Sequence, residues 1–189
     1  MNKHIVNPSD YLYPQPVVLV GADVDGRSNF TTVSWVGIAN ETPPMISVAL
    51  RHERHSLKGI RQNLTFSVNI PSTDMVKETD YCGIVSGEKV NKAEVCKFKV
   101  YYGNVSHAPL IQQCPVCLEC EVRHSIDLGS HSLVIGEIKH AHIVQGGLID
   151  GNSDYNKINP IAFITGRTGQ YHVVGSFLGD AYCVGKDIK

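Results

Sequence analysis

The amino-acid sequence predicts a mainly β fold, a β-barrel with short helical excursions. Three observations predict it: strand-like stretches recur along most of the chain, two short segments have helical spacing, and glycine-containing turns separate the strands. The 189 residues, 42% of them hydrophobic, are enough to bury one sizeable core. We therefore expect a single domain over residues 1–189.

Strands are expected to dominate the first half of the chain. Residues 17–48 run through VVLVGAD, the turn-rich DGRSN, TTVSWVGIAN and, after a Pro-Pro pair, MISVALR, a pattern typical of a β-meander. A short helix is expected to begin near Ser56, a residue type that caps helices, because apolar residues recur behind it at helical spacing. TFSVNIPS then predicts a strand, and a second short helix should open at Ser72 or Thr73.

The second half contains the clearest strand signal. VCLECEVRHSIDLGSHSLVIGEIKHAHIV has two alternating runs on either side of a Gly-Ser turn, which predicts an antiparallel hairpin. The preceding SGEKVNKAEVCKF is polar and turn-rich, and the tail NPIAFITGRTGQYHVVGSFLGDAY adds a strand and glycine turns. Together these stretches complete a barrel.

Charge and composition exclude several classes of partner. The formal net charge is -1, from 17 basic and 18 acidic residues without long like-charge runs, so we expect no binding of nucleic acid or of a membrane surface. No apolar stretch is long enough to span a bilayer, and the N-terminus lacks the apolar region of a signal peptide. We expect a cytoplasmic protein whose six cysteines are reduced.

Glycine-rich phosphate loops and common hydrolase motifs are missing. The sequence has no GxGxxG after a strand, no GxxxxGKS/T, no GxSxG and no HExxH. A different phosphate site is suggested by ALRHERHSLKGI, where a strand ending at Arg51 brings Arg54 and His55 to the expected helix start at Ser56. Free N–H groups and the helix dipole favour an anion there. The alternative is a solvated basic loop with an ordinary serine cap.

A second cluster of polar residues lies in SNFTTVSWV. It combines hydrogen-bonding side chains with the chain's single tryptophan, at Asn29, Thr31, Thr32, Ser34 and Trp35. Such groups can bind the edge of a heteroaromatic ring, although threonine and serine also suit an ordinary half-exposed strand.

Several segments in the same order resemble a known family. YPQPVVLVGADVDGRSNFTTVSWVGIANETPPMISVALRHERHSLKGIRQNLTFSVNIPS, VSGEKVNKAE, HSLVIGEI and YHVVGSFLGDAY are similar to the flavin reductase-like family of FMN-binding split barrels, most closely its flavoredoxin branch. The resemblance runs from about Tyr13 to Gly185. It implies a six-stranded Greek-key split barrel that dimerises, with one non-covalent FMN near each subunit seam.

The resemblance also implies which residues bind the flavin. The polar cluster would line the isoalloxazine ring, and the strand-to-helix junction would hold the phosphate through Arg51, Ser56 and His55. The other implied contacts come from later segments of the chain: Lys92, Lys89, His131, Phe163 and Tyr171, with Cys82 in the same vicinity. The bound flavin would supply the redox chemistry, so no catalytic side chain is required.

Two kinds of electron donor remain open. NAD(P)H would make the chain a flavin reductase-like oxidoreductase, whereas a reduced electron-transfer protein would make it an FMN electron carrier or flavin-binding module without turnover. Both readings imply a homodimer, and neither can be selected from the sequence.

Three cysteines suggest a competing metal site. Cys114, Cys117 and Cys120 have the spacing of zinc or iron–sulfur ligands. However, no fourth ligand is nearby, and a spacing of three on a strand places neighbouring side chains on opposite faces. We interpret them as structural or redox-sensitive thiols and predict no metal. His140 and His142 would share a strand face, but they lack a third ligand.

Overall fold

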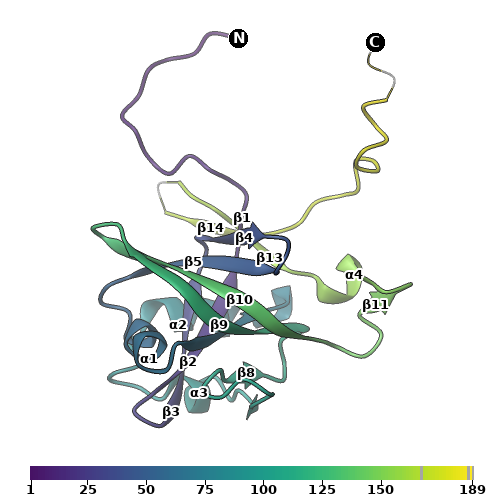
Figure 1. Ribbon diagram of the computed structural model, residues 1–189. Coiled ribbons are helices and arrows are strands. Elements are labelled where there is room, and N and C mark those ends of the chain that lie inside the picture. The colour runs from purple at the N-terminus through teal and green to yellow at the C-terminus, as the bar shows by residue number, and fades with distance from the viewer. Residues whose placement is uncertain (167, 187, 189) are drawn as a thin grey trace.

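The computed structural model describes residues 1–166, 168–186 and 188. A seven-stranded antiparallel sheet, in the order β3-β2-β6-β9-β10-β5-β4, curves into a barrel (Figure 1). Its strands are β2 (Val18–Val24), β3 (Arg27–Val33), β4 (Val36–Asn40), β5 (Met45–Arg51), β6 (Thr65–Ile70), β9 (Val116–Asp127) and β10 (His131–Ile143). The mainly β fold class is thus confirmed.

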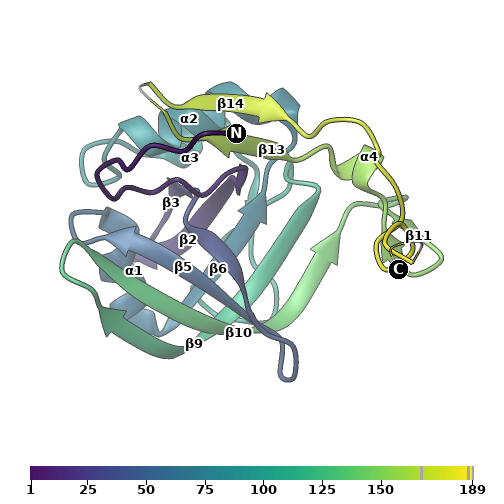
Figure 2. The same ribbon diagram turned by 90° about the horizontal axis from the view of Figure 1, so that it is seen from above.

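Smaller elements surround the barrel. A second sheet joins β1 (Gln15–Pro16), β13 (Ile161–Ile164) and β14 (Gln170–Val173), and Figure 2 shows β13 and β14 beside the helices that flank the barrel. Two short pairs are formed by β7 (Val100–Tyr101) with β8 (Leu110–Ile111) and by β11 (Leu148–Ile149) with β12 (Asn152–Ser153). The helices are α1 (His55–Asn63), the 3-10 turn η1 (Thr73–Met75), α2 (Val76–Ile84), α3 (Lys92–Val95) and α4 (Tyr155–Ile158).

The core lies on both faces of β2. Every residue of this strand is buried. Val18 and Val20 belong to the cluster inside the barrel, whereas Leu19 belongs to a second apolar cluster, formed with residues between η1 and β9. A strand covered on both faces has no polar side, which is why VVLVGAD is a continuous apolar run rather than an alternating one.

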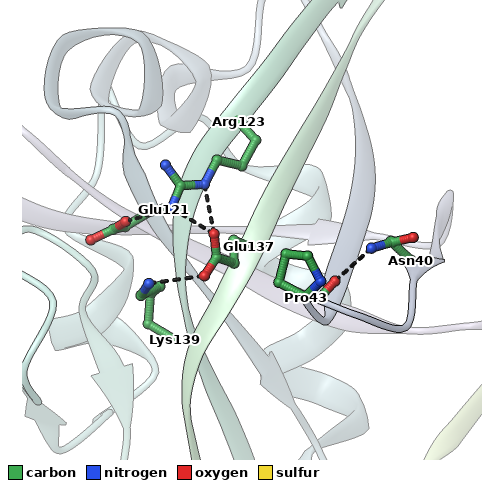
Figure 3. Close-up of polar contacts among 6 residues, drawn as sticks. All are labelled: Asn40, Pro43, Glu121, Arg123, Glu137 and Lys139. Carbon is green, nitrogen blue, oxygen red and sulfur yellow. Dashed lines mark hydrogen bonds and ion pairs between the residues drawn. The ribbon is translucent and has the colours of Figure 1, made fainter.

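The long β9–β10 hairpin carries a network of exposed charges. Glu137 accepts hydrogen bonds from Arg123 Nε at 2.7 Å and from Lys139 Nζ at 2.9 Å, while Glu121 also faces Arg123 (Figure 3). The Lys139 and Arg123 bonds lower the pKa of Glu137. Exposed pairs of this kind contribute little to stability but favour one strand register over its neighbours.

Most expected elements are present, with two differences. Residues 17–48 do not form the expected β-meander, because the consecutive strands β3 and β4 lie at opposite edges of the seven-stranded sheet. The expected hairpin corresponds to β9 and β10, and the second helix follows a 3-10 turn that Ser72 precedes. However, the polar segment SGEKVNKAEVCKF contains the short helix α3, which was not expected; Asn91 caps it by accepting from the backbone N–H of Glu94. Among the helices of the described residues, none is both long and apolar enough to cross a membrane.

Candidate functional site

Two adjoining cavities lie where β5 leads into α1. The first, about 350 Å³ and here called the aromatic cavity, is lined by residues that include Thr32, Ser34, Trp35, His131 and Phe163. The second, about 300 Å³ and here called the basic cavity, is lined by residues that include Thr31, His55, Lys92 and residues 83–87. Arg51 and Arg54 line both, so the two cavities form one elongated site.

Flat side chains form the walls of the aromatic cavity. Trp35, 44% exposed between β3 and β4, stacks on His131 with ring centroids 4.6 Å apart and an interplanar angle of 29°. Phe163 comes from β13. Burial, and then the nearby Arg51 guanidinium, lowers the pKa of His131, so the imidazole is neutral at pH 7. The cavity therefore suits a planar ring with hydrogen-bonding edges.

The basic cavity combines cations with backbone groups and with one carboxylate, that of Glu53, which lies 3.6 Å from Arg51. Arg54 Nη1 donates to the Gly83 carbonyl at 2.7 Å, which leaves the rest of its guanidinium free to face the cavity. Lys92 is only 3% exposed and donates from Nζ to the carbonyls of Phe30 and Cys82, at 2.8 Å each. Burial lowers the pKa of Lys92. Burial also lowers the pKa of His55.

The structure corrects the expected role of Ser56. Helix α1 begins at His55, its N-cap is Arg54 in an extended conformation, and no side chain caps it. Ser56 instead lies inside the first turn, fully buried, and its Oγ accepts a hydrogen bond from Asn29 Nδ2 at 2.7 Å. A Cβ on Gly87 would lie 1.7 Å from Asn29 Oδ1. Asn29 and Ser56 thus form a buried support beneath the basic cavity.

A buried hydroxyl without a partner belongs to a residue that lines the basic cavity. Thr31 is 2% exposed and lines the basic cavity, and its Oγ1 has no hydrogen-bond partner within the described part of the chain. Leaving a buried hydroxyl unpaired costs free energy, so such an atom calls for a partner, for which a water, an ion or a bound ligand would serve. Its neighbour Thr32 donates to the Thr79 carbonyl and lines the aromatic cavity.

Besides Asn29 and Ser56, two further expected contacts lie outside the lining of both cavities. Lys89 is exposed on the loop before α3. Tyr171 is half-buried on β14, where its hydroxyl donates to Asp80 Oδ1 at 3.0 Å and its ring lies 5.6 Å from that of Phe163. The Cys82 thiol is buried in the second apolar cluster, and burial raises its pKa to about 12.

Of the three closely spaced cysteines, Cys117 and Cys120 lie on opposite faces of β9 as predicted, whereas Cys114, which precedes the strand, lies on the same side as Cys117. Cys114 and Cys117 lie in the second apolar cluster, whereas Cys120 lies inside the barrel. Burial raises the pKa of Cys117 to about 11. In the described residues, no three His, Cys, Asp or Glu side chains are grouped to hold a metal ion. His142 instead binds the fully buried Glu119, with Nε2 2.7 Å from Oε1.

The comparison with protein families decides which family this fold and site belong to. The model of the flavin reductase like domain matches residues 11–159. The chain belongs to this family. The split barrel expected from the resemblance is confirmed, but its sheet has seven strands rather than the expected six.

Solved structures of this family are closely similar. A flavoredoxin from Methanosarcina acetivorans is 38% identical, with a TM-score of 0.95 and full coverage of both chains. The flavoredoxin of Desulfovibrio vulgaris (Miyazaki F) is 33% identical, with a TM-score of 0.90 over 98% of this chain and 100% of that one. In the comparison of sequences rather than structures, an FMN reductase (NADH), RutF, from Acinetobacter baylyi is 25% identical over 68% of this chain and 66% of its own length.

Some lining residues of this flavin reductase-like chain were not among the sequence candidates. Arg54 lies at the strand-to-helix junction but is not among the flavin contacts that the resemblance implies, although it lines both cavities. Asp10 and Thr165 line the aromatic cavity, and Thr165 Oγ1 donates to the Asp10 carbonyl at 3.2 Å. Residues 83–87 line the basic cavity without a side-chain motif that would mark them. In the sequence, the loop is indicated only by residues 85–87, the VSG that opens the segment VSGEKVNKAE, which resembles the family.

Proposed function

We propose that this chain is a flavoprotein that holds one FMN non-covalently and passes electrons through it. The observation that carries the proposal is the joined pair of cavities, one basic and one aromatic, with Arg51 and Arg54 lining both. FMN has matching chemistry, with an anionic phosphate at one end and a planar ring at the other. The flavoredoxins and the FMN reductase to which the chain is similar support the same cofactor.

The basic cavity would hold the phosphate. Arg51 and Arg54 supply positive charge, and His55 supplies a ring N–H that can donate a hydrogen bond to the phosphate. Thr31 would donate its unpartnered hydroxyl to the cofactor. We assign Ser56 and Asn29 a supporting role beneath this cavity, because their polar atoms bind each other.

The aromatic cavity would hold the isoalloxazine ring. Trp35, His131 and Phe163 would pack against the ring, and Thr32 and Ser34 would lie near its edge. The flavin supplies the redox chemistry when bound. The neutral His131, stacked on Trp35, would then orient the ring without adding charge, and the walls would exclude water from it.

Lys92 and Lys89 receive different roles. The Lys92 amine already donates to two carbonyls, so we propose that it acts mainly by holding the wall of the basic cavity and by adding positive charge beside it. The exposed Lys89 would contact the flavin only if its loop moved toward the basic cavity.

We further propose a homodimer in the cytoplasm. Large apolar side chains on the C-terminal segment are almost fully exposed, Leu178 at 98% and Tyr182 at 96%, and a second subunit would cover them. All six cysteines are free thiols, a state that the cytoplasm maintains.

Two donors fit this site. NAD(P)H would make the chain an FMN-dependent oxidoreductase, in line with its similarity to an FMN reductase (NADH). A reduced electron-transfer protein would make it an FMN carrier, and the similarity to two flavoredoxins favours keeping this second candidate.

A spectroscopic experiment tests the cofactor and the donor together. The purified protein, loaded with FMN if necessary, should be yellow, and its absorbance should be followed anaerobically with NADH and with NADPH. Rapid bleaching would establish the reductase, whereas bleaching only with dithionite or a reduced iron protein would establish the carrier. A colourless protein that takes up neither FMN nor FAD would contradict the proposal.

The unpartnered hydroxyl of Thr31 predicts that its removal changes stability and FMN affinity in opposite directions. Thr31→Val should raise the melting temperature of the flavin-free protein slightly, because it removes an unpaired buried hydroxyl. The same change should weaken FMN binding up to about tenfold, as expected for one lost hydrogen bond. Thermal melts and flavin titrations would measure the two effects.

Thr79→Val is the matched control for Thr31→Val. Thr79 Oγ1 is also buried and has no partner within the described part of the chain, but it is not among the lining residues of either cavity. This control should raise stability similarly and leave FMN affinity unchanged. Equal effects of both variants on FMN affinity would show that Thr31 does not contact the cofactor.

A further inference from the structure

The last turns of α2 connect several parts of the proposed flavin site. Four side chains in or beside the two cavities donate hydrogen bonds to this helix: Thr32 to the Thr79 carbonyl, Tyr171 to the Asp80 carboxylate at 3.0 Å, Lys92 to the Cys82 carbonyl at 2.8 Å and Arg54 to the Gly83 carbonyl at 2.7 Å. The final carbonyls of a helix lack partners within it and favour cations. The end of α2 is therefore a natural anchor for this site.

The Tyr171–Asp80 bond differs from the other three because it reaches a separate sheet. Strands β13 and β14 do not belong to the seven-stranded sheet, and Figure 2 shows them beside α2. Tyr171 on β14 is the register partner of Phe163 on β13, and their ring centroids are 5.6 Å apart at an interplanar angle of 56°. A contact that holds the Tyr171 side chain in place therefore also holds the position of Phe163 on the neighbouring strand.

The turn of this hairpin is shaped around the Phe163 ring. Gly169 has a φ of +64°, and a Cβ at this position would lie 2.7 Å from Phe163 Cζ. Phe163 is thus enclosed by the hairpin that carries it on one side and faces the aromatic cavity on the other. Movement of the hairpin would move the wall of the cavity.

We propose that Asp80 and Tyr171 are positioning residues whose hydrogen bond holds the β13–β14 hairpin against α2 and so sets Phe163 in the wall of the aromatic cavity. The inference rests on the proposed function, since it assigns that wall to the flavin ring. Tyr171 thereby acts through Phe163 rather than by contact with the cofactor. Burial and the Asp80 bond raise the pKa of Tyr171 to about 12, which keeps its hydroxyl a donor at neutral pH.

Three variants test this role by two measurements. Tyr171→Phe and Asp80→Ala should each weaken FMN binding about tenfold, equivalent to about 1.4 kcal/mol. In the flavin-free protein, they should speed hydrogen exchange of residues 161–166 and 168–173 by about tenfold. Asp80→Asn should keep FMN affinity and hydrogen exchange of the hairpin close to wild type, because an amide Oδ1 still accepts from the tyrosine hydroxyl.

Tyr102→Phe is the matched control. Tyr102 donates to Asp23 Oδ1 at 2.8 Å, which is the same chemical pair at a position away from both cavities. It should leave flavin affinity and exchange of the hairpin unchanged.

The outcomes separate this inference from the proposed function. Faster exchange without weaker FMN binding would overturn the inference, as would wild-type behaviour of Tyr171→Phe or equal losses in Asp80→Asn and Asp80→Ala. A wild-type protein that binds no flavin would overturn the proposed function. Exchange in the flavin-free protein would still show whether Asp80 and Tyr171 hold the hairpin.

Discussion

Arg54→Ala is expected to weaken FMN binding about a hundredfold. Arg54 lines both cavities, so its loss removes positive charge beside the phosphate and also releases the Gly83 carbonyl that forms part of the opposite wall. A hundredfold change corresponds to about 2.8 kcal/mol, within the range of one charge-assisted hydrogen bond. Fluorescence titration of FMN into the flavin-free protein would measure it.

Arg61→Ala is the control for this variant. Arg61 also belongs to α1, but its guanidinium donates to Ser132 Oγ at 2.8 Å and is not part of the described lining of either cavity. Riboflavin gives a second comparison, because it lacks the phosphate. Arg54→Ala should affect riboflavin much less than FMN, and an equal loss for both flavins would refute a phosphate contact at Arg54.

His142→Ala should destabilise the fold by about 2–3 kcal/mol. Its partner Glu119 is fully buried, and the removal of His142 would leave the carboxylate with only the Val105 N–H, 2.5 Å from Oε2, among the described contacts. Leaving a buried acceptor without its partner costs about 1–3 kcal/mol, and more for a charged group, and the His142 side chain is itself 33% exposed. The melting temperature should fall by about 5–10 °C.

Two further variants test the interpretation of His142. His140→Ala, at an exposed position two residues earlier on β10, should change the melting temperature by no more than about 1–2 °C. Glu119→Gln in the His142→Ala background should recover stability, because it removes the unpaired charge. A double variant less stable than His142→Ala would contradict the role given to the pair.

The fold was largely predictable because its strongest signals are local. The β9–β10 hairpin alternates over two long runs, and the continuous apolar pattern of β2 reflects burial on both faces. Helix α3 was missed because four residues in a polar segment carry too little periodicity to detect. The helix cap was misassigned because Ser56 found a better partner in Asn29, a residue of β3 that no local pattern connects to it.

The site was predictable where side chains mark it and not where backbone forms it. Trp35, Arg51 and His131 line the cavities as expected from the resemblance. In contrast, the wall formed by residues 83–87 has no side-chain signature. The sequence also could not show that the Lys92 amine and the Tyr171 hydroxyl are already engaged, because their acceptors lie on α2 and β3 and become neighbours only in the folded chain.

The carbonyl anchors of Arg54 and Lys92 have a consequence for handling the protein. Neutral carbonyls hold these cations in place without cancelling their charge, and among the described residues neither is paired with a carboxylate. Glu53, which also lines the basic cavity, pairs with Arg51 at 3.6 Å and offsets part of this charge, and an anion from outside the chain would offset more of it. Phosphate or sulfate buffers would partly fill that role, stabilise the flavin-free protein and compete with FMN, so zwitterionic buffers of low ionic strength are the appropriate medium for every titration.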